Sequence, residues 1–317
     1  MQFNLFPHSP NVDFMRLRWA SATLSVLLLV VAIGAMATKG FNFALDFTGG
    51  VGVELRYDKA PDVDDVRAGL EKAGFDSAVV QTFGAGTDLL VRLQAPKQEG
   101  ASGANTESIG DAVAKAASLP GNAAEKRSSA EISPQVGKEL AQNGVYAMLF
   151  VVFGFLAYIS FRFEWKFAVA AIIATLHDVV VVAGWFAFSG HEFDLTVLAG
   201  VMSVMGYSIN DTIVVFDRVR ENFRGMRATP REILNASVNQ TLSRTVITSF
   251  VAFLTVVALY IYGGGSLQGM AESQMMGIII GTLSSIFVAC PLLLWFGVTK
   301  QDLMPKAKDL AALERRP

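Results

Sequence analysis

The sequence of 317 residues contains one cysteine and three histidines. Cys290 alone cannot form an intrachain disulfide, so an exported domain would have to be held together by its own core. So few histidines and cysteines give no cluster with the spacing of a metal site. The chain also lacks a G-x-x-x-x-G-K-[ST] phosphate-binding loop, which argues against ATP as an energy source. Because no Ser-His-Asp arrangement fits either, we expect a protein that is not an enzyme, holds no cofactor or metal, and binds no nucleic acid.

Charged residues are also scarce, at 17% against 52% hydrophobic residues, and the mean hydropathy is +0.42. This composition is too apolar for a soluble protein. The first long apolar run, residues 19–38, is uncharged and follows Arg16 and Arg18, and as a helix it would span about 30 Å, the thickness of a bilayer core. A cleaved signal peptide is the alternative, because residues 35–37 (AMA) resemble a cleavage site. Since the apolar part of a signal peptide usually has roughly 7–15 residues, we favour an uncleaved anchor.

Further apolar runs raise the predicted number of membrane-spanning helices to six; they cover residues 143–161, 167–188, 195–216, 245–262 and about 275–298. An even number of spans puts both chain ends on one side. Arginines and lysines follow the second and fourth helices, whereas loops 189–194 and 263–274 contain none. The positive-inside rule then places both termini in the cytoplasm. The predicted parts are an N-terminal segment with helix 1 (1–38), an external domain (39–142), a five-helix bundle (143–298) and a cytoplasmic tail (299–317).

The predicted external domain shows the patterns of an α+β fold. Residues 51–57 alternate in polarity with the period of a strand, and an amphipathic helix follows over 61–74. A hairpin is predicted from 77–83 and 88–94, then a loop at 95–105, a helix around 109–116 and a weak strand at 126–132. The order βαββαβ suggests a ferredoxin-like unit. The predicted fold class is therefore a polytopic α-helical membrane protein with six transmembrane helices and one ferredoxin-like domain between helices 1 and 2.

One acidic residue lies deep inside an apolar run. Sixteen uncharged residues precede Asp211, and five more separate it from Asp217. An ionisable group at this depth is energetically costly, which indicates a functional role. Ser208 and Arg218 fall on the same helix face, and a carboxyl group in a low dielectric can bind and release protons as its access changes. The alternative is a structural acid that pairs with Asn210, with Arg218 or with a neighbouring helix.

Three more ionisable residues lie in or beside the apolar runs. Arg244 precedes the fifth run, where it could pair with Asp211 or extend its side chain to the lipid headgroups. His177 and Asp178 lie in the middle of the third run and point about 100° apart on a helix. Two roles of this pair are equally possible from the sequence, a structural hydrogen bond between helices and a second proton-relay station.

The last apolar run carries small residues at intervals of four, Gly277, Gly281, Ser285 and Ala289. Such a stripe lets another helix approach closely, although the ordinary glycine content of membrane helices is an equal alternative. Pro291, further along the same run, is expected to kink the helix.

Several segments resemble signatures of the bacterial SecD/SecF protein-export family, relatives of the RND exporters, and especially its SecF-type members. Residues 45–50 (LDFTGG) are similar to the family's D-F-x-G-G signature, and residues 133–140 (SPQVGKEL) to its x-P-x-V-G-x-E-L segment. The His-Asp-Val pattern at 177–179 also matches. The most specific segments are 206–222 (GYSINDTIVVFDRVREN) and 239–245 (NQTLSRT). The signature positions in this chain are Asp46, Gly49, Gly50, Asn210, Asp217 and Arg218.

This resemblance covers nearly the whole chain and implies an acid–arginine pair on helices 4 and 5, at Asp211 and Arg244. It implies an accessory subunit of the Sec translocase in the bacterial inner membrane, which works with a SecD-like subunit and the SecYEG channel. Protons would serve as the coupling ion, and the proton-motive force would help to draw secreted preproteins across the membrane. RND-type proteins have twelve helices, so a second chain would supply the other half, and the small-residue stripe is a candidate docking face. The alternative is one half of an RND-type exporter of small molecules or lipids, against which the single external domain argues.

Overall fold

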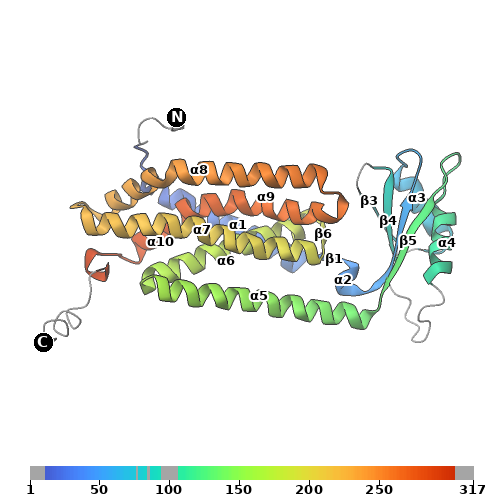
Figure 1. The fold of residues 1–317 in the computed structure, drawn as a ribbon, viewed down its shortest axis with the longest axis horizontal. Coiled ribbons are helices and arrows are strands. Elements are labelled where there is room, and N and C mark those ends of the chain that lie inside the picture. The colour runs from blue at the N-terminus through green and yellow to red at the C-terminus, as the bar shows by residue number, and fades with distance from the viewer. Residues whose placement is uncertain (1–10, 76–77, 84–85, 94–105, 304–317) are drawn as a thin grey trace, which may run out of the picture.

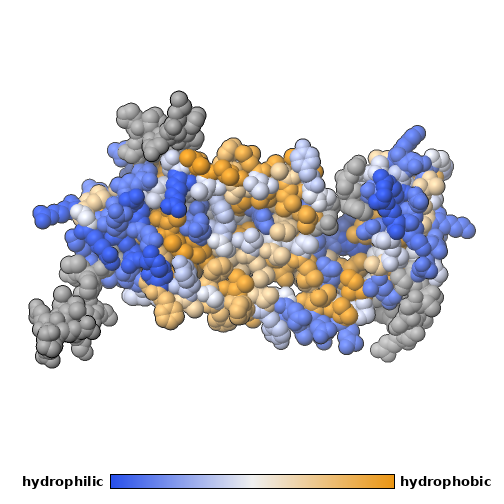
Figure 2. Space-filling view, viewed as in Figure 1, coloured by the Kyte–Doolittle hydropathy of each residue, from blue (hydrophilic) through white to orange (hydrophobic). Residues whose placement is uncertain are grey.

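The computed structural model describes residues 11–75, 78–83, 86–93 and 106–303. The loop predicted at 95–105, part of the hairpin turn and the tail beyond residue 303 lie outside these ranges. Within them, six helices are long and apolar enough to cross a membrane, as the sequence predicts. Figure 1 shows these helices as one elongated bundle with a small α+β unit at one end. On the face shown in Figure 2, hydrophobic residues gather over the middle of the bundle and hydrophilic residues toward its ends.

The membrane helices are listed here in chain order with their bounds. They are α1 (Arg18–Thr38), α5 (Pro134–Arg162), α6 (Trp165–Ser189), α7 (Leu195–Gly225), α8 (Pro230–Tyr262) and α9 (Gly265–Ser284), the last continued by a π-helical turn (Ser285–Ala289) and α10 (Cys290–Trp295). A 3₁₀ turn (Phe14–Leu17) precedes α1, and another (Lys300–Leu303) follows α10. We call the end of the bundle next to the α+β unit its domain end, and the end near residues 13 and 298 its terminal end.

Capping residues set where the helices begin, so α5 and α8 start well before their apolar runs, whereas α7 starts together with its run. Asp194 caps α7 by accepting a hydrogen bond from the backbone N–H of Val197 over 2.7 Å. Thr229 and Glu232 form a capping box at the start of α8. Arg244 therefore lies well inside α8 and not at the start of a helix, contrary to the sequence-based expectation. The predicted boundary between residues 142 and 143 likewise falls inside α5.

The bundle has a central layer and a periphery. Between 56% and 61% of the most apolar window is buried in α6, α7 and α9, against 11–17% in α1, α5 and α8. Close packing of α9 on α7 depends on glycine, because a Cβ on Gly277 would lie 2.0 Å from Val204 Cγ2 and one on Gly281 would lie 3.2 Å from Ser208 Cβ. The small-residue stripe thus contacts α7 of the same chain. Its predicted role as a docking face for a partner is wrong.

Pro291 is accommodated by the π-helical turn that directly precedes α10. Proline has no N–H to donate to the carbonyl group four residues earlier, and a wider turn absorbs that missing bond. The buried thiol of Cys290 lies 3.4 Å from the carbonyl oxygen of Ser285. The sequence predicts an irregularity at this proline, and the structure shows that it takes the form of a π turn.

The α+β domain, residues 50–132, follows the element order β, α, β, β, α, β. Its elements are β2 (Gly50–Arg56), α3 (Val63–Lys72), β3 (Val79–Phe83), β4 (Asp88–Leu93), α4 (Thr106–Ala117) and β5 (Glu125–Ile132). The strands form an antiparallel sheet in the order β3-β4-β2-β5. One face of the sheet packs on α3 and α4 around Val53, Val91 and Leu70, so the domain has a hydrophobic core of its own.

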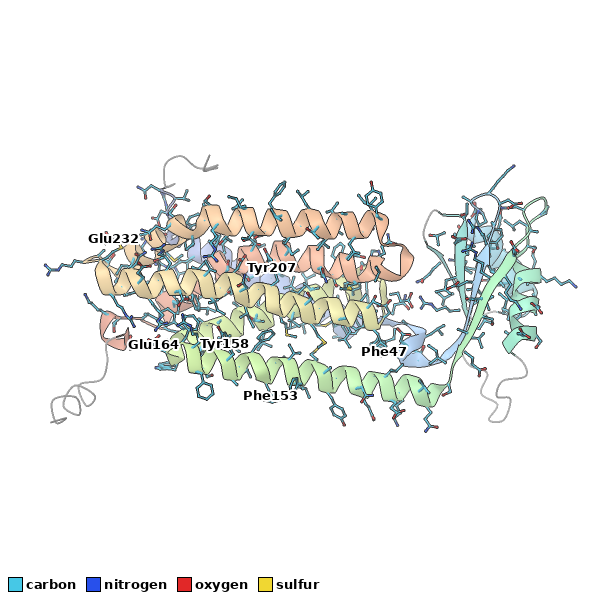
Figure 3. All side chains as sticks on the ribbon, in the orientation of Figure 1. Phe47, Phe153, Tyr158, Glu164, Tyr207 and Glu232 are labelled. Carbon is cyan, nitrogen blue, oxygen red and sulfur yellow. The ribbon has the colours of Figure 1, made fainter. Side chains whose placement is uncertain are left out.

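Short elements join this domain to the bundle. The strands β1 (Asn42–Phe43) and β6 (Glu192–Phe193) pair in parallel, and the single-turn helix α2 (Leu45–Thr48) follows β1. Phe47 of α2 lies at the domain end of the bundle, between α5 and the sheet (Figure 3). A cluster of phenylalanine rings that includes Phe43, Phe47 and Phe193 fills this junction. β2, which follows α2, therefore starts from an anchored position, and β5 ends just before the start of α5.

Candidate functional site

The first polar cluster in the bundle surrounds Asp178, whose side chain is completely buried. Ser208 of α7 and Ser284 of α9 both donate to Oδ2, over 2.5 and 2.6 Å. His177 Nδ1 lies 2.9 Å from Oδ1, so the ring donates to the carboxylate when Nδ1 carries the proton. We call His177, Asp178, Ser208 and Ser284 the Asp178 cluster. Although adjacent residues of a helix diverge, the His177 ring turns back onto its neighbour.

The second polar cluster surrounds Asp211, one helical turn beyond Ser208 on α7. Asp211 is 2% exposed, and among the described residues its carboxylate accepts one hydrogen bond, from the Ser249 hydroxyl of α8 over 3.4 Å. Tyr207 and Thr282 each donate to the Ser249 oxygen, over 2.7 and 2.8 Å. We call Asp211, Tyr207, Ser249 and Thr282 the Asp211 cluster. In Figure 3 Tyr207 lies in the middle part of the bundle, between Glu232 at the terminal end and Phe47 at the domain end.

The two carboxyl groups differ in how well they are solvated by the protein. Three polar groups, from His177, Ser208 and Ser284, surround the Asp178 carboxyl group and hold it at a fixed position. Asp211 has one long hydrogen bond, and among the described residues it takes part in no ion pair. A buried carboxyl group with so few donors can change its protonation state without breaking a network. The geometry therefore makes Asp211 the more suitable of the two for proton exchange.

Arg244 lies near Asp211 and acts on it electrostatically, but within the described ranges no hydrogen bond or ion pair joins the two residues. The Arg244 side chain is exposed on the surface of the bundle, as is Asn210 beside Asp211. Exposed polar groups at this depth would face hydrocarbon if lipid alone covered them, which is unfavourable. The predicted acid–arginine contact is thus absent from this conformation, although the two residues lie on adjacent helices.

Other signature residues lie at the two ends of the bundle. Asp46 of α2 accepts a hydrogen bond from the backbone N–H of Leu195, the first residue of α7, over 3.2 Å. Gly49 and Gly50 have φ of 70° and 137°, values that side-chain-bearing residues rarely adopt. A Cβ on Gly137 of α5 would lie 3.0 Å from the backbone nitrogen of Gly49. The glycine pair therefore provides the turn into β2, and Gly137 lets α5 pack closely against that turn.

At the terminal end, Asp217 accepts two hydrogen bonds from Arg162 of α5, over 2.9 and 3.0 Å. Arg218 pairs with Glu221 of its own helix and is partly exposed. Neither residue contacts Asp211, so the alternative in which Arg218 neutralises the deep acid finds no support in this geometry.

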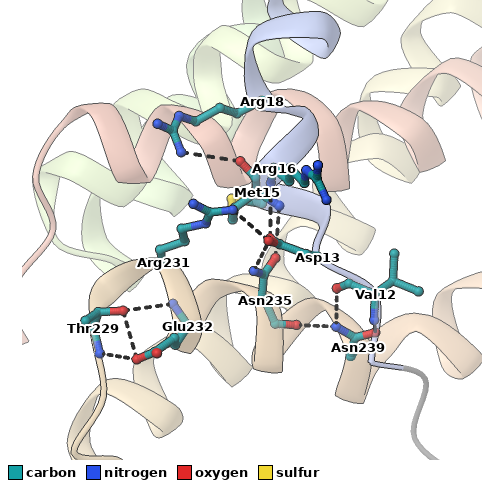
Figure 4. A network of polar contacts seen from close by, with 10 residues as sticks. All are labelled: Val12, Asp13, Met15, Arg16, Arg18, Thr229, Arg231, Glu232, Asn235 and Asn239. Atoms are coloured by element: carbon teal, nitrogen blue, oxygen red, sulfur yellow. Dashed lines mark hydrogen bonds and ion pairs between the residues drawn. The ribbon is translucent and has the colours of Figure 1, made fainter.

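The N-terminal segment is attached to α8 at the same end (Figure 4). Asp13 accepts hydrogen bonds from Asn235 over 2.5 Å and from Arg231 over 2.6 Å. The backbone N–H of Met15 donates to Asn235, and that of Val12 donates to Asn239. These contacts hold the start of α1 against the beginning of α8.

Sequence reasoning missed Ser249, Thr282 and Ser284. Their signal is weak, because single Ser or Thr residues are common in membrane helices and often bond to the carbonyl group four residues earlier. Ser249 and Thr282 do make such bonds, to Thr245 and Ile278. Only the packing of the helices shows that Ser249 also faces Asp211, that Thr282 also faces Ser249, and that Ser284 faces Asp178.

Fold and site together describe a multi-pass helical membrane protein with carboxyl groups buried in the middle of its bundle. The profile described as "Protein export membrane protein SecD/SecF, C-terminal" matches residues 112–299, and the one described as "SecD/SecF GG Motif" matches residues 34–61. The chain belongs to the SecD/SecF family.

Similar proteins of known sequence are SecF subunits. The chain is 44% identical over 303 residues to the protein translocase subunit SecF of Pseudomonas aeruginosa, a match that covers 94% of this chain and 96% of the relative. It is 43% identical over 295 residues to SecF of Escherichia coli O157:H7, covering 92% and 90%.

Two solved structures are also similar. SecDF of Thermus thermophilus, described as a translocon-associated membrane protein, gives a TM-score of 0.80 at 37% identity and covers 90% of this chain. A structure of SecDF in a super-membrane-facing form gives 0.65 at 35% identity and covers 96%. The chain spans about two fifths of each of these longer proteins, 39% and 40%.

Proposed function

We propose that this protein is a SecF-type accessory subunit of the Sec protein translocase, which uses the proton-motive force to assist export of proteins across the inner membrane. Membership of the SecD/SecF family supports the Sec assignment. The observation that carries the proton-coupled part is Asp211, a buried carboxyl group with one long hydrogen bond in the middle of an apolar bundle. Such a group is costly to bury, and its presence therefore supports a functional role.

Binding and release of a proton at Asp211 would act through Arg244 in this proposal. The ionised carboxylate attracts the guanidinium, and protonation removes that attraction. Because Asp211 lies on α7 and Arg244 on α8, the two states favour different relative positions of these helices. A small helix shift at the middle of the bundle would then reach the α+β domain through the outer ends of the helices.

The exposed polar groups support a partner in the membrane. Arg244 and Asn210 lie on the lipid-facing surface of the isolated chain, where a second polar helix surface would be a better neighbour than hydrocarbon. We infer that a SecD-like subunit covers this surface and completes a twelve-helix unit, and that the complex works beside the SecYEG channel on secreted preproteins.

We further infer that the α+β domain is a ferredoxin-like unit in the periplasm and that both termini are cytoplasmic. The element order and the strand order β3-β4-β2-β5 support the first part. Arginines at the terminal end support the second, because Arg162, Arg218 and Arg231 lie there and cytoplasmic loops are rich in such residues.

The proton-coupling proposal is tested with Asp211→Asn, which keeps the shape of the side chain and removes its titration. Export into inner-membrane vesicles is measured with ATP alone and with ATP plus a proton gradient. We expect the stimulation by the gradient to disappear, while export with ATP alone persists. Glu221→Gln is the matched control, because it changes an exposed acid of the same helix that pairs with Arg218 of that helix. Undiminished stimulation in Asp211→Asn would contradict the proposal.

A further inference from the structure

An arginine of the α+β domain lies buried on the side of the sheet that faces away from the domain core. In β4, Val91 and Leu93 point toward α3 and α4, so Arg92 between them points to the opposite face. That face would be open to solvent if the domain stood alone, yet Arg92 is only 7% exposed. Figure 1 shows this face of the sheet turned toward the domain end of the bundle.

Residues from the bundle side of the junction cover Arg92. Its guanidinium forms an ion pair with Glu192 of β6, in the connection between α6 and α7. Within the sheet it donates to Gln81 over 2.6 Å. Gly52, the residue opposite Arg92 on β2, lets α2 pack against the same face of the sheet, because a Cβ there would lie 3.0 Å from the Leu45 side chain.

Two further carboxylates near Arg92 are fixed to the first turn of α7. Asp194 accepts from the backbone N–H of Val197 over 2.7 Å, and Asp46 accepts from that of Leu195 over 3.2 Å. Burial lowers the pKa of Arg92 to about 10, while the charges of Asp194 and Asp46 oppose that effect. Arg92 therefore remains protonated at neutral pH, where separation from its carboxylates would leave a buried charge without a partner.

We propose that Arg92 is a positioning residue that fixes the α+β domain to the domain end of α7 through Glu192, Asp194 and Asp46. A displacement of α7 then moves the domain with it instead of sliding past it. The consequence for export rests on the proposed function, because α7 carries Asp211. The attachment itself does not depend on the proposed function, since the attachment follows from contacts at the junction.

The attachment is tested by measuring the position of the domain relative to the bundle. Spin labels are placed at Glu71→Cys on α3 and Gln268→Cys on α9, both exposed, in the full chain with Cys290→Ser. We expect one narrow distance distribution for the parent and a distribution at least twofold broader for Arg92→Glu. The charge exchange Arg92→Glu with Glu192→Arg should narrow it again, a rescue that a residue needed only for folding would not give.

Arg56→Glu is the matched control. Arg56 also belongs to the sheet, but it is exposed and pairs with Asp88 inside the domain, so its loss should leave the distribution narrow. Glu192→Gln breaks the ion pair from the bundle side and should also broaden the distribution, even if Arg92→Glu fails to fold. Unchanged distributions in both Arg92→Glu and Glu192→Gln would overturn the proposal.

Export measurements separate this inference from the proposed function. If the attachment transmits movement, Arg92→Glu should reduce gradient-stimulated export severalfold, and the charge exchange should restore part of it. If Arg92→Glu broadens the distance distribution but keeps normal gradient-stimulated export, Arg92 does not transmit movement. That result would not affect the proposed role of Asp211. If Asp211→Asn keeps its gradient-stimulated export while Arg92→Glu broadens the distance distribution, the proposed function is refuted and the attachment is retained.

Discussion

The Ser208 hydroxyl donates to Oδ2 of Asp178 over 2.5 Å and so joins α7 to α6 in the middle of the bundle. The same α7 presents Asp211 to α8 one turn further along. One helix therefore connects a carboxyl group that is fully hydrogen-bonded with one that is not. The two carboxyl groups therefore differ in the number of polar groups that hold them in place.

Replacement of Ser208 by alanine should weaken the α6–α7 contact, because one of three donors to a buried carboxylate is lost. Hydrogen bonds between membrane helices contribute about 0.6–2 kcal/mol, and a loss in this range is expected. The measurement is thermal unfolding in detergent, with Ser203→Ala, an exposed serine of the same helix, as the neutral control. Equal stability of the two variants would show that Asp178 does not need this donor.

Gly277→Ala should destabilise the bundle by about 1–3 kcal/mol, because the new methyl group would overlap Val204 and force α9 away from α7. Gly154→Ala in α5 is the control, since nothing lies within 4 Å of its Cβ position. That variant should be neutral or gain up to about 1 kcal/mol of helix propensity. Thermal unfolding of both variants checks the prediction. Unchanged thermal stability of Gly277→Ala would contradict the close packing of α9 on α7.

Ser249→Ala should reduce gradient-stimulated export, because it removes the one hydrogen bond to Asp211 and the oxygen to which Tyr207 and Thr282 donate. We expect a severalfold loss of stimulation, with export on ATP alone preserved. Thr255→Ala is the matched control, since this exposed hydroxyl of α8 bonds to the carbonyl group of Val251. If both variants behave alike, the Ser249 hydroxyl has no part in coupling.

Attachment of the N-terminal segment should be lost in acid. Hydrogen bonds from Asn235 and then the charge and hydrogen bond of Arg231 lower the pKa of Asp13 below its ordinary value of 3.8. A carboxyl group with a lowered pKa contributes fully above its unfolded value, and the contribution disappears as the pH falls through the folded one. The protection of the Met15 amide against hydrogen exchange, measured relative to the intrinsic exchange rate at each pH, should therefore fall below about pH 4. In Asp13→Asn the protection of the Met15 amide should already be reduced at neutral pH.

The orientation of the chain can be read by cysteine labelling, because the native Cys290 is buried. A membrane-impermeant maleimide should label Glu71→Cys in intact spheroplasts, since α3 is proposed to be periplasmic. Arg227→Cys, between α7 and α8, should react only after the membrane is opened. The opposite pattern would reverse the proposed topology.

The elements were largely predictable because their signals are local. Six apolar runs gave six helices, and alternation over residues 51–57 gave β2. The helix ends were predicted less well, since α8 begins at Pro230 and not near residue 245. Its capping box is a polar signal, which a search for apolar runs does not register. Ser249 and Arg92 were missed for a related reason, because nothing near them in sequence indicates what they contact.

Sequence alone determined that the chain crosses a membrane and that one acidic residue, Asp211, lies deep inside a membrane-spanning helix. Both follow from hydropathy along a helix, where neighbours in sequence share an environment. Tertiary structure decided how each polar group is satisfied. It gave Asp178 three donors and Asp211 one, turned Arg244 outward, and occupied the glycines of α9 with α7. These outcomes depend on which helix faces pack together, and residues far apart in the chain settle that jointly.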